Sequence, residues 1–305
     1  MAPLPRSIRK LGTVDCDIVE ANPVVWQNRL LRFEYIRWQS EAKHYYGNPT
    51  GHSYFRFVDC ADGSAGAPFG VDLHMGNAFV RQDRMIVTAV EDWGKNRFYQ
   101  LESTDLVHWS EPRVILEDPS WGGYNTSVCR AGDRFLLTFE LGEPIELVQN
   151  RFSMFFAESY DLKTWRFLPD KHFDLDIYTG GPMVRYFDGW YYFFYLHYHP
   201  RDAGKESYRE HVARSRDLVH WEWSKFNPIL DYGEDDRKLG RSGFTPEQIE
   251  KIRTAEDFNV SDLDMCGWKN GIYMVYAWGN QHGTEFLAEA KVENMTEAEF
   301  CASLF

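Results

Sequence analysis

"STDLVHW" at residues 103–109 recurs as "SYDLKTW" at 159–165 and as "SRDLVHW" at 215–221, an interval of 56 residues each time. A repeat of this length is typical of a β-propeller or another array of similar units. The Ser and Asp of the motif suit a tight turn, because their side chains bond nearby backbone N–H groups. We therefore expect a structural turn far from the axis, with Leu and Trp filling the space between neighbouring units.

The stretches around each motif predict small antiparallel sheets. Residues 77–91, NAFVRQDRMIVTAVE, contain two strands about a polar turn, and residues 97–116 add two more. Two further units keep only the first half of this pattern, at 22–35 and 264–279. The sequence thus predicts one all-β domain over residues 1–305. It is a five-bladed β-propeller of four-stranded antiparallel blades that start near residues 22, 77, 125, 181 and 264.

Two segments stand outside the repeat. SIRKLGTVD at 7–15 precedes the first unit, and we expect it to add the outer strand of the last blade, which would close the ring and remove an exposed edge. TPEQIEKIRTAED at 245–257 has a threonine cap, proline in its first turn and helical apolar spacing. It predicts a helical insertion at about 231–260, between blades four and five.

Charge and composition restrict the partners. A net charge of −13 argues against a nucleic acid or an anionic membrane, which both attract clustered Lys and Arg. The chain shows no apolar run of signal-peptide length at its start and no apolar segment of 18 residues, so we expect a cytoplasmic protein unless a signal was trimmed. The five cysteines are scattered without a Cys-x-x-Cys pair, so the sequence predicts neither a zinc site nor a disulfide framework. Nothing indicates the oligomeric state.

A blade that begins with Asn22-Pro23, followed by the repeated Asp-Leu turns, resembles the five-bladed β-propeller glycoside hydrolases, the superfamily of families 43, 32, 117 and 130. The resemblance implies a family 43-like glycosidase. In family 43 a general-base Asp stands in an Asp-Pro of blade one, with an assisting Asp and a general-acid Glu on later blades. Here the inner-strand starts are Asn22, Asn77, Asn125 and Gly181, and only Asp264 is an acid. The family mechanism therefore does not carry over unaltered.

Strand geometry locates the face that would hold a site. Each second strand runs back along the first, so loops leaving second strands and loops entering first strands surround one mouth, opposite the Asp-Leu turns. These loops are rich in Trp, His and carboxylates, which suit sugar rings and their hydroxyls. Rim positions also include Trp38, Trp121, His44, His52 and His282. The predicted substrate-binding residues are Asn22, Asn77, Asn125, His74, Trp93, Tyr178, His197, His199 and Trp278.

Four acids are the candidate catalytic residues. Glu20 and Asp262 lie two residues before the inner-strand starts of blades one and five, which ring closure makes neighbours, so with Asp264 they would form one cluster. Like charges held close raise one pKa and give a protonated acid beside an ionised base. Glu140 ends a second strand and would reach in from across the pore. Which carboxylate is acid and which base stays open, as do the sugar, the linkage and the stereochemical outcome.

The leading hypothesis is a glycoside hydrolase acting on a short oligosaccharide or glycoside in the axial pocket. One alternative is a phosphorylase resembling family 130, with a phosphate cradle drawn from Arg185, Arg201, Arg209 and His199. Another is a non-catalytic carbohydrate-binding propeller. No cofactor is required by this chemistry, although the axial asparagines and Asp264 offer hard oxygen ligands to a central Ca²⁺.

Overall fold

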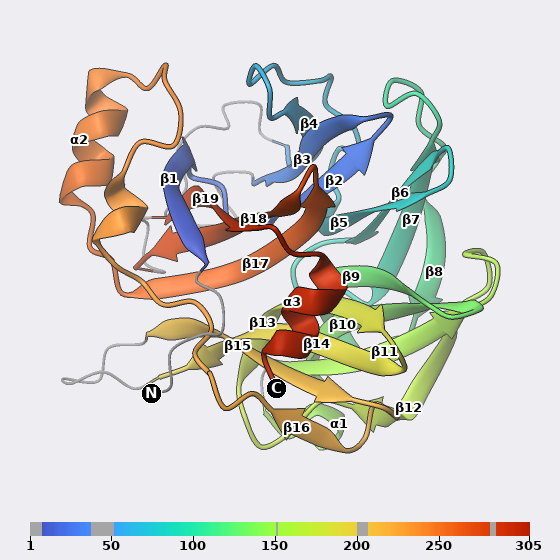
Figure 1. Cartoon of the computed structure of the whole chain (residues 1–305). Helices are drawn as coiled ribbons and strands as arrows, with labels where there is room; N and C mark the ends of the chain where they lie inside the picture. The colour runs from blue at the N-terminus through green and yellow to red at the C-terminus, as the bar shows by residue number, and fades with distance from the viewer. Residues whose placement is uncertain (1–7, 38–51, 151, 200–206, 281–284) are drawn as a thin grey trace.

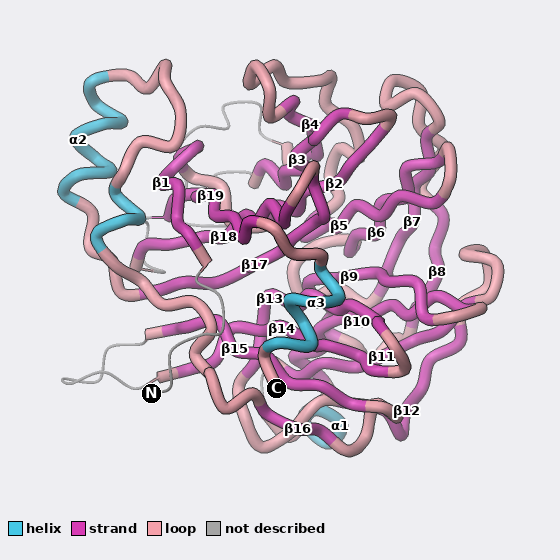
Figure 2. The backbone as a smooth tube through the Cα atoms, viewed as in Figure 1, coloured by secondary structure: helices cyan, strands magenta, loops and turns pink. Residues whose placement is uncertain are grey.

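The structure is a computed structural model that describes residues 8–37, 52–150, 152–199, 207–280 and 285–305. The strands form a ring of five antiparallel blades, which confirms the fold predicted from the repeat (Figure 1). A single parallel pair, Tyr208 with Asn259, joins blades four and five into one sheet. Figure 2 shows that helix is confined to short segments outside the blades.

The blades follow one another along the chain. Blade one has β2 (Ala21–Trp26), β3 (Arg29–Ile36) and β4 (Tyr54–Asp59); blade two has β5 (His74–Arg81), β6 (Arg84–Val90), β7 (Arg97–Ser103) and β8 (Arg113–Glu117). Blade three has β9 (Gly122–Ala131), β10 (Arg134–Glu143), β11 (Ser153–Ser159) and β12 (Arg166–His172). Blade four has β13 (Thr179–Phe187), β14 (Trp190–Tyr198), β15 (Tyr208–Ser215) and β16 (Trp221–Trp223). Blade five has β17 (Asn259–Trp268), β18 (Gly271–Gly279), β19 (Glu285–Glu293) and β1 (Arg9–Cys16).

Blade one differs from the expected four strands. Its named strands are β2, β3 and β4, and isolated bridges from Phe69 to Phe55 and from Ala65 to Val58 stand in place of the fourth. Phe69 also stacks on Trp109 from the first Asp-Leu turn, with ring centroids 3.8 Å apart. The edge of blade one is therefore covered by side chains from blade two.

The first strand closes the ring as predicted. β1 pairs antiparallel with β19, from Arg9 opposite Lys291 to Cys16 opposite Phe286, so the blue and red ends of the chain share blade five (Figure 1). The buried Thr13 hydroxyl links this strand to both neighbours: it donates to the Asp236 carbonyl at 2.7 Å and accepts from Trp278 Nε1 at 2.9 Å. Closure thus removes the β19 edge and ties it to the insertion.

The Asp-Leu motifs are structural turns, as predicted. In the second motif, Ser159 Oγ accepts from the backbone N–H of Leu162 at 2.9 Å, and Asp161 Oδ1 accepts from Lys163 at 2.7 Å. The same bonds recur in the other two motifs. Trp165 carries the contact between blades, since its Nε1 donates to Gln100 Oε1 in blade two at 3.3 Å. The motif therefore belongs to the scaffold.

Helical segments follow blades four and five. The insertion contains η2 (Glu234–Arg237) and α2 (Pro246–Thr254), whose predicted cap is present: Thr245 Oγ1 accepts from the backbone N–H of Gln248. A short α1 (Ile145–Val148) lies in blade three, and α3 (Glu297–Ser303) ends the chain beside blade four (Figure 1). No helix in the described ranges has the length and apolar character needed to span a bilayer.

Candidate active site

A depression on the axis is lined by residues from all five blades. Its residues come from the mouth ends of the inner strands, on the face opposite the Asp-Leu turns. The lining residues are Glu20, Ala21, Gly76, Asn77, Asn125, Thr126, Gly181, Pro182, Asp262, Leu263 and Asp264. The predicted meeting of blades one and five is confirmed here, because Glu20 and Asp262 share this lining.

The inner strands contribute two layers of axial residues. In each blade, the hairpin between the first two strands closes on one residue pair, such as Trp26 with Arg29 in blade one. The residue four positions before the first member of that pair belongs to the lower axial layer. That layer contains Asn22, Asn77, Ser127, Met183 and Asp264. Asn125 and Gly181 lie two residues nearer the mouth, in the layer that also contains Glu20 and Asp262.

Bulges shape the mouth layer. The strand pairings of β5, β13 and β17 each shift register near the mouth, and at these shifts Met75, Gly181 and Asp262 have φ of 45°, 55° and 55°. Bulges beside active sites commonly redirect a side chain. Asp tolerates this left-handed conformation better than most residues do. The bulge in β17 therefore directs the Asp262 carboxyl toward the axis.

Glu140 on β10 lies directly behind this lining and is 4% exposed. Its Oε1 accepts from the Gly181 backbone N–H at 3.1 Å, and its Oε2 accepts from Asn125 Nδ2 at 3.0 Å. Burial and the negative charge of Asp262 raise the pKa of Glu140 to about 8. At neutral pH this carboxyl group is therefore mostly protonated.

Asp262 has a second acidic neighbour. Burial and the charge of Glu20 raise the pKa of Asp262 to about 7, so it exchanges a proton near neutral pH. Two nitrogens of the Arg37 guanidinium donate hydrogen bonds to the Glu20 carboxylate: Nε, at 3.0 Å, and Nη2. The mouth thus holds one ion-paired carboxylate, one carboxyl group that titrates near pH 7 and one that is mostly protonated at neutral pH.

Two glycines allow these carboxyl groups to approach. A Cβ on Gly180 would lie 2.9 Å from Glu140 Oε1, and a Cβ on Gly181 would lie 2.9 Å from Asp262 Oδ1. Gly181 also has a φ of +55°, which most L residues avoid. The Gly-Gly pair of blade four is therefore required by the geometry of the two acids.

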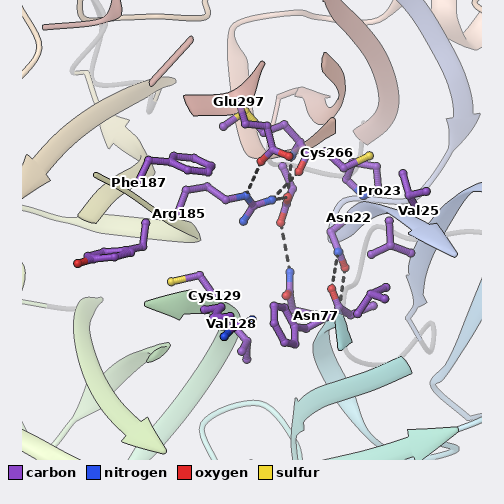
Figure 3. Close-up of a pocket in the computed structure, with 18 residues that line it drawn as sticks. Asn22, Pro23, Val25, Asn77, Val128, Cys129, Arg185, Phe187, Cys266 and Glu297 are labelled. Atoms are coloured by element: carbon purple, nitrogen blue, oxygen red, sulfur yellow. Dashed lines mark hydrogen bonds and ion pairs between the residues drawn. The ribbon is translucent and has the colours of Figure 1, made fainter. Parts of the chain in front are cut away.

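Asp264 lies deeper and is differently paired. Its Oδ1 accepts from Arg185 at 2.6 Å, and its Oδ2 accepts from Asn77 Nδ2 at 3.2 Å. Asn77 and Asp264 line both the mouth depression and a second axial cavity on the opposite side. Figure 3 shows this second cavity, with Arg185 reaching toward Glu297 of α3 and Asn22 on the other side. Asp264 thus forms the floor between two cavities, and its catalytic role stays a prediction.

Glu210 on β15 was not singled out from the sequence. It is fully buried, and its Oε1 accepts from the Leu263 backbone N–H at 3.1 Å, inside the β17 bulge. Burial, with the charges of Asp262 and Asp264, raises its pKa well above the usual range. Among the described residues Glu210 Oε2 has no hydrogen-bond partner. In the sequence YREHVARS, strand alternation places Glu210 on the same face as the apolar Val212, and this could have indicated that Glu210 is buried.

An exposed tryptophan stands beside Glu20. Trp93 is 38% exposed, and the Arg37 guanidinium lies 5.2 Å from its ring centroid. Trp93 Nε1 donates to the Tyr35 hydroxyl at 3.4 Å, and that hydroxyl bonds His74 Nδ1 at 2.8 Å. His74 is buried below this group and supports Trp93. Trp93 is therefore exposed near Glu20, and its contact with substrate stays a prediction.

A row of aromatic rings crosses the mouth side of blades three and four. Successive centroids lie 4.6 to 5.9 Å apart. The row contains Tyr124, Phe152, Tyr178, Tyr208 and Tyr198. It begins beside the Trp93 loop, since a Cβ on Gly94 would lie 2.9 Å from the Tyr124 hydroxyl. The predicted rim residue Tyr178 is therefore part of a larger aromatic surface.

The remaining predicted rim residues differ in their surroundings, and substrate contact by His197 and His199 stays a prediction. Trp278 is fully buried against Phe286 and Thr13, so the prediction that it binds substrate was wrong. Trp121 is likewise buried in the core of blade three, against Phe98 and Phe139. His197 and His199 group with His211 on blade four. Trp38, His44, Arg201 and His282 lie outside the described residues.

The axial asparagines are engaged by protein groups. Asn22 bonds the Ala78 backbone through both of its amide atoms, at 2.8 and 2.9 Å, and so links blades one and two. Asn77 and Asn125 donate to Asp264 and Glu140. Substrate contact by these residues stays a prediction, and so does a central Ca²⁺.

Comparisons with known proteins support the fold. No protein-family model and no curated sequence matches the chain. Many solved structures do. An α-L-arabinofuranosidase from Podospora anserina in complex with cellotriose has a TM-score of 0.62 at 11% identity, over 95% of this chain and 99% of that one. An α-L-arabinanase from Penicillium chrysogenum complexed with arabinobiose gives 0.57 at 9%, over 95% and 99%.

A family GH43 protein from Bacillus licheniformis has a TM-score of 0.57 at 13% identity, over 96% of this chain and 57% of that one. At these identities the likeness concerns the fold. It confirms the propeller architecture expected from the repeat.

Proposed function

We propose that this chain is a glycoside hydrolase with Glu140 as general acid and Asp262 as general base. The observation that carries the proposal is a pair of carboxyl groups on either side of Gly180-Gly181, Glu140 buried and Asp262 half-buried, at the point where all five blades meet. Glycoside hydrolysis needs one protonated and one ionised carboxyl group. Burial and mutual repulsion supply that difference here.

In the proposed reaction Asp262 accepts one proton and Glu140 donates one. Asp262 takes a proton from a water molecule as the water oxygen attacks C1 of the sugar. Glu140 gives its proton to the glycosidic oxygen as the bond from C1 to that oxygen breaks. Glu20 keeps a negative charge beside Asp262 and so maintains its basicity, while Arg37 holds Glu20 in place. Proton exchange with solvent restores both groups.

The surface around the mouth fits a sugar. Trp93 and the aromatic row beginning at Tyr124 offer apolar faces on which sugar rings stack, with acids and amides between them for hydroxyls. Similar structures include two α-L-arabinofuranosidases and an α-L-arabinanase. We therefore infer a short oligosaccharide or glycoside as substrate, with an α-L-arabinofuranoside as the first to test.

The phosphorylase alternative needs a phosphate cradle near these acids. Arg185 pairs with Asp264 and Glu297 at the second cavity, and Arg209 pairs with Asp231 at 3.0 Å. Both described arginines proposed for the cradle are thus neutralised by carboxylates. This pairing favours water over phosphate as the nucleophile.

The experiment is a screen of nitrophenyl glycosides and arabino-oligosaccharides, with and without added phosphate. We expect phosphate-independent release of sugar, reduced by about 10²- to 10⁴-fold in Glu140→Gln and in Asp262→Asn. Glu222→Gln on exposed β16 is the matched control and keeps the full rate. Strict phosphate dependence would establish a phosphorylase, and sugar binding by calorimetry without turnover would establish a binding protein. Either result overturns the proposal.

A further inference from the structure

Three histidines form a compact group on blade four, apart from the acids of the mouth. His197 lies at the end of β14, and His199 directly follows that strand; because they are two residues apart, their side chains point to the same side. His211 comes from β15. His211 lies opposite Tyr195 and Arg209 lies opposite His197, so His197 and His211 are diagonal neighbours on one sheet face. The strand register alone therefore brings these rings together.

The distances within the group are short. His199 Nε2 and His211 Nε2 lie 3.0 Å apart, and the rings of His197 and His211 stack with centroids separated by 4.4 Å. One ring nitrogen from each of the three residues lies within 4.8 Å of the others. This spacing suits three imidazoles that share a single ion. Within the described ranges, no other set of three or more His, Cys, Asp or Glu side chains meets it.

The floor of the group is rigid. The Tyr195 ring lies 6.1 Å from the His197 ring and 5.9 Å from the His211 ring, and Tyr195 belongs to the buried cluster that blade four makes with Met154 and Phe173 of blade three. The backbone ladder continues past β14, where the His199 N–H donates to the Ser207 carbonyl at 2.7 Å. Both strands are thus fixed where the histidines project.

The protein groups leave the imidazoles neutral and incompletely bonded. Burial and the neighbouring histidines lower the pKa of His211 to about 3, and burial also lowers the pKa of His197 and His199. The buried His197 Nδ1 has no hydrogen-bond partner among the described residues. Arg209, a described cation whose charge acts on His199 and His211, is balanced by Asp231. Neutral imidazole is the form that ligates metal ions.

We propose that His197, His199 and His211 bind one divalent transition-metal ion, with Zn²⁺ as the physiological candidate. Three nitrogen donors match the preference of Zn²⁺, Cu²⁺ and Ni²⁺ for imidazole, whereas Ca²⁺ and Mg²⁺ prefer oxygen. Three protein ligands leave a further coordination position for water or a small ligand. The site does not depend on the glycosidase proposal, because it contains neither Glu140 nor Asp262.

The test uses the full chain after treatment with EDTA. Isothermal titration with Zn²⁺ is expected to give one site per chain, and Co²⁺ is expected to give the visible absorption bands of a nitrogen-bound ion. His199→Ala removes a partly exposed ligand and should weaken Zn²⁺ binding by more than about 10-fold. His211→Ala should do the same, with circular dichroism to check folding. The control is the double variant His108→Ala/His220→Ala. These two histidines lie in the Asp-Leu turns, and each is hydrogen-bonded to the Asp of its own turn.

The expected result is loss of the Co²⁺ bands in His199→Ala and their retention in the double control variant. The proposal is overturned if the unaltered chain binds no Zn²⁺, or if His199→Ala binds it as tightly as the control does. Because the readouts are calorimetry and absorption, the outcome is independent of whether any glycoside is hydrolysed.

Discussion

Glu140 and Asp262, from blades three and five, meet across the backbone of blade four. Glu140 accepts the Gly181 N–H at 3.1 Å, and Asp262 Oδ1 lies 2.9 Å from where a Cβ on Gly181 would stand. Glu140 lies on the second strand of its blade, and Asp262 lies on an inner strand, two residues nearer the mouth than Asp264. The pair is produced by a bulge in β17, a bulge in β13 and two glycines.

Gly181→Ala should therefore damage the site. The new Cβ would push on the Asp262 carboxyl, and the left-handed backbone would cost about 1 to 2 kcal/mol. Gly132→Ala is the matched control, because Gly132 has a similar φ of +67° with no atom within 4 Å of its Cβ position. We expect both variants to lose stability in urea unfolding, Gly181→Ala more than Gly132→Ala because of its close contacts with Asp262, and only Gly181→Ala to lose most of its kcat. Equal activities would show that the Asp262 position is not critical.

Asp264→Asn separates two assignments of the catalytic acids. If Asp264 is catalytic, as its sequence position suggested, the variant is inactive and stably folded. From its ion pair with Arg185 we expect the opposite: the free energy of unfolding falls by about 3 kcal/mol and kcat is kept. Denaturant unfolding together with steady-state kinetics measures both quantities, with Asp262→Asn run in parallel as the variant expected to be inactive.

The pH dependence of kcat/KM should be a narrow bell. Activity falls below about pH 7 as Asp262 gains a proton, and it falls above about pH 8 as Glu140 loses one. Glu20 raises the pKa of both groups, so Glu20→Gln should move both limbs of the profile to lower pH. If neither limb moves, the charge of Glu20 does not raise the pKa of Asp262 or Glu140. The exposed Glu222→Gln gives the reference profile.

Much of the fold was predictable because its signals are local. The interval between Asp-Leu turns counts blades, and the Thr245 cap with its proline marks α2. Ring closure by β1 followed from the need to cover an edge strand. These features depend on turn and cap chemistry within a few residues, which a single sequence displays directly.

The site was only partly predictable because its geometry depends on bulges. The sequence singled out Glu20, Asp262 and Glu140 as candidates, but it did not show that Asn125 and Gly181 lie two residues nearer the mouth than Asn22 and Asn77 do. A bulge adds a residue without changing the apolar pattern, so sequence spacing does not reveal it. The burial of Trp278 was missed for another reason. Residues of the insertion and of β1 cover its ring, and the sequence next to Trp278 gives no sign of these distant segments.

Ring closure itself can be tested at Thr13. Thr13→Val keeps the shape but leaves Trp278 Nε1 and the Asp236 carbonyl without their buried partner, which should cost about 1 to 3 kcal/mol. The control is Thr138→Val in β10, because the buried Thr138 hydroxyl has no hydrogen-bond partner among the described residues. There the expected change is near zero or stabilising. Chemical unfolding of both variants gives the comparison. Equal losses would mean that the side-chain bonds of Thr13 contribute nothing specific to ring closure.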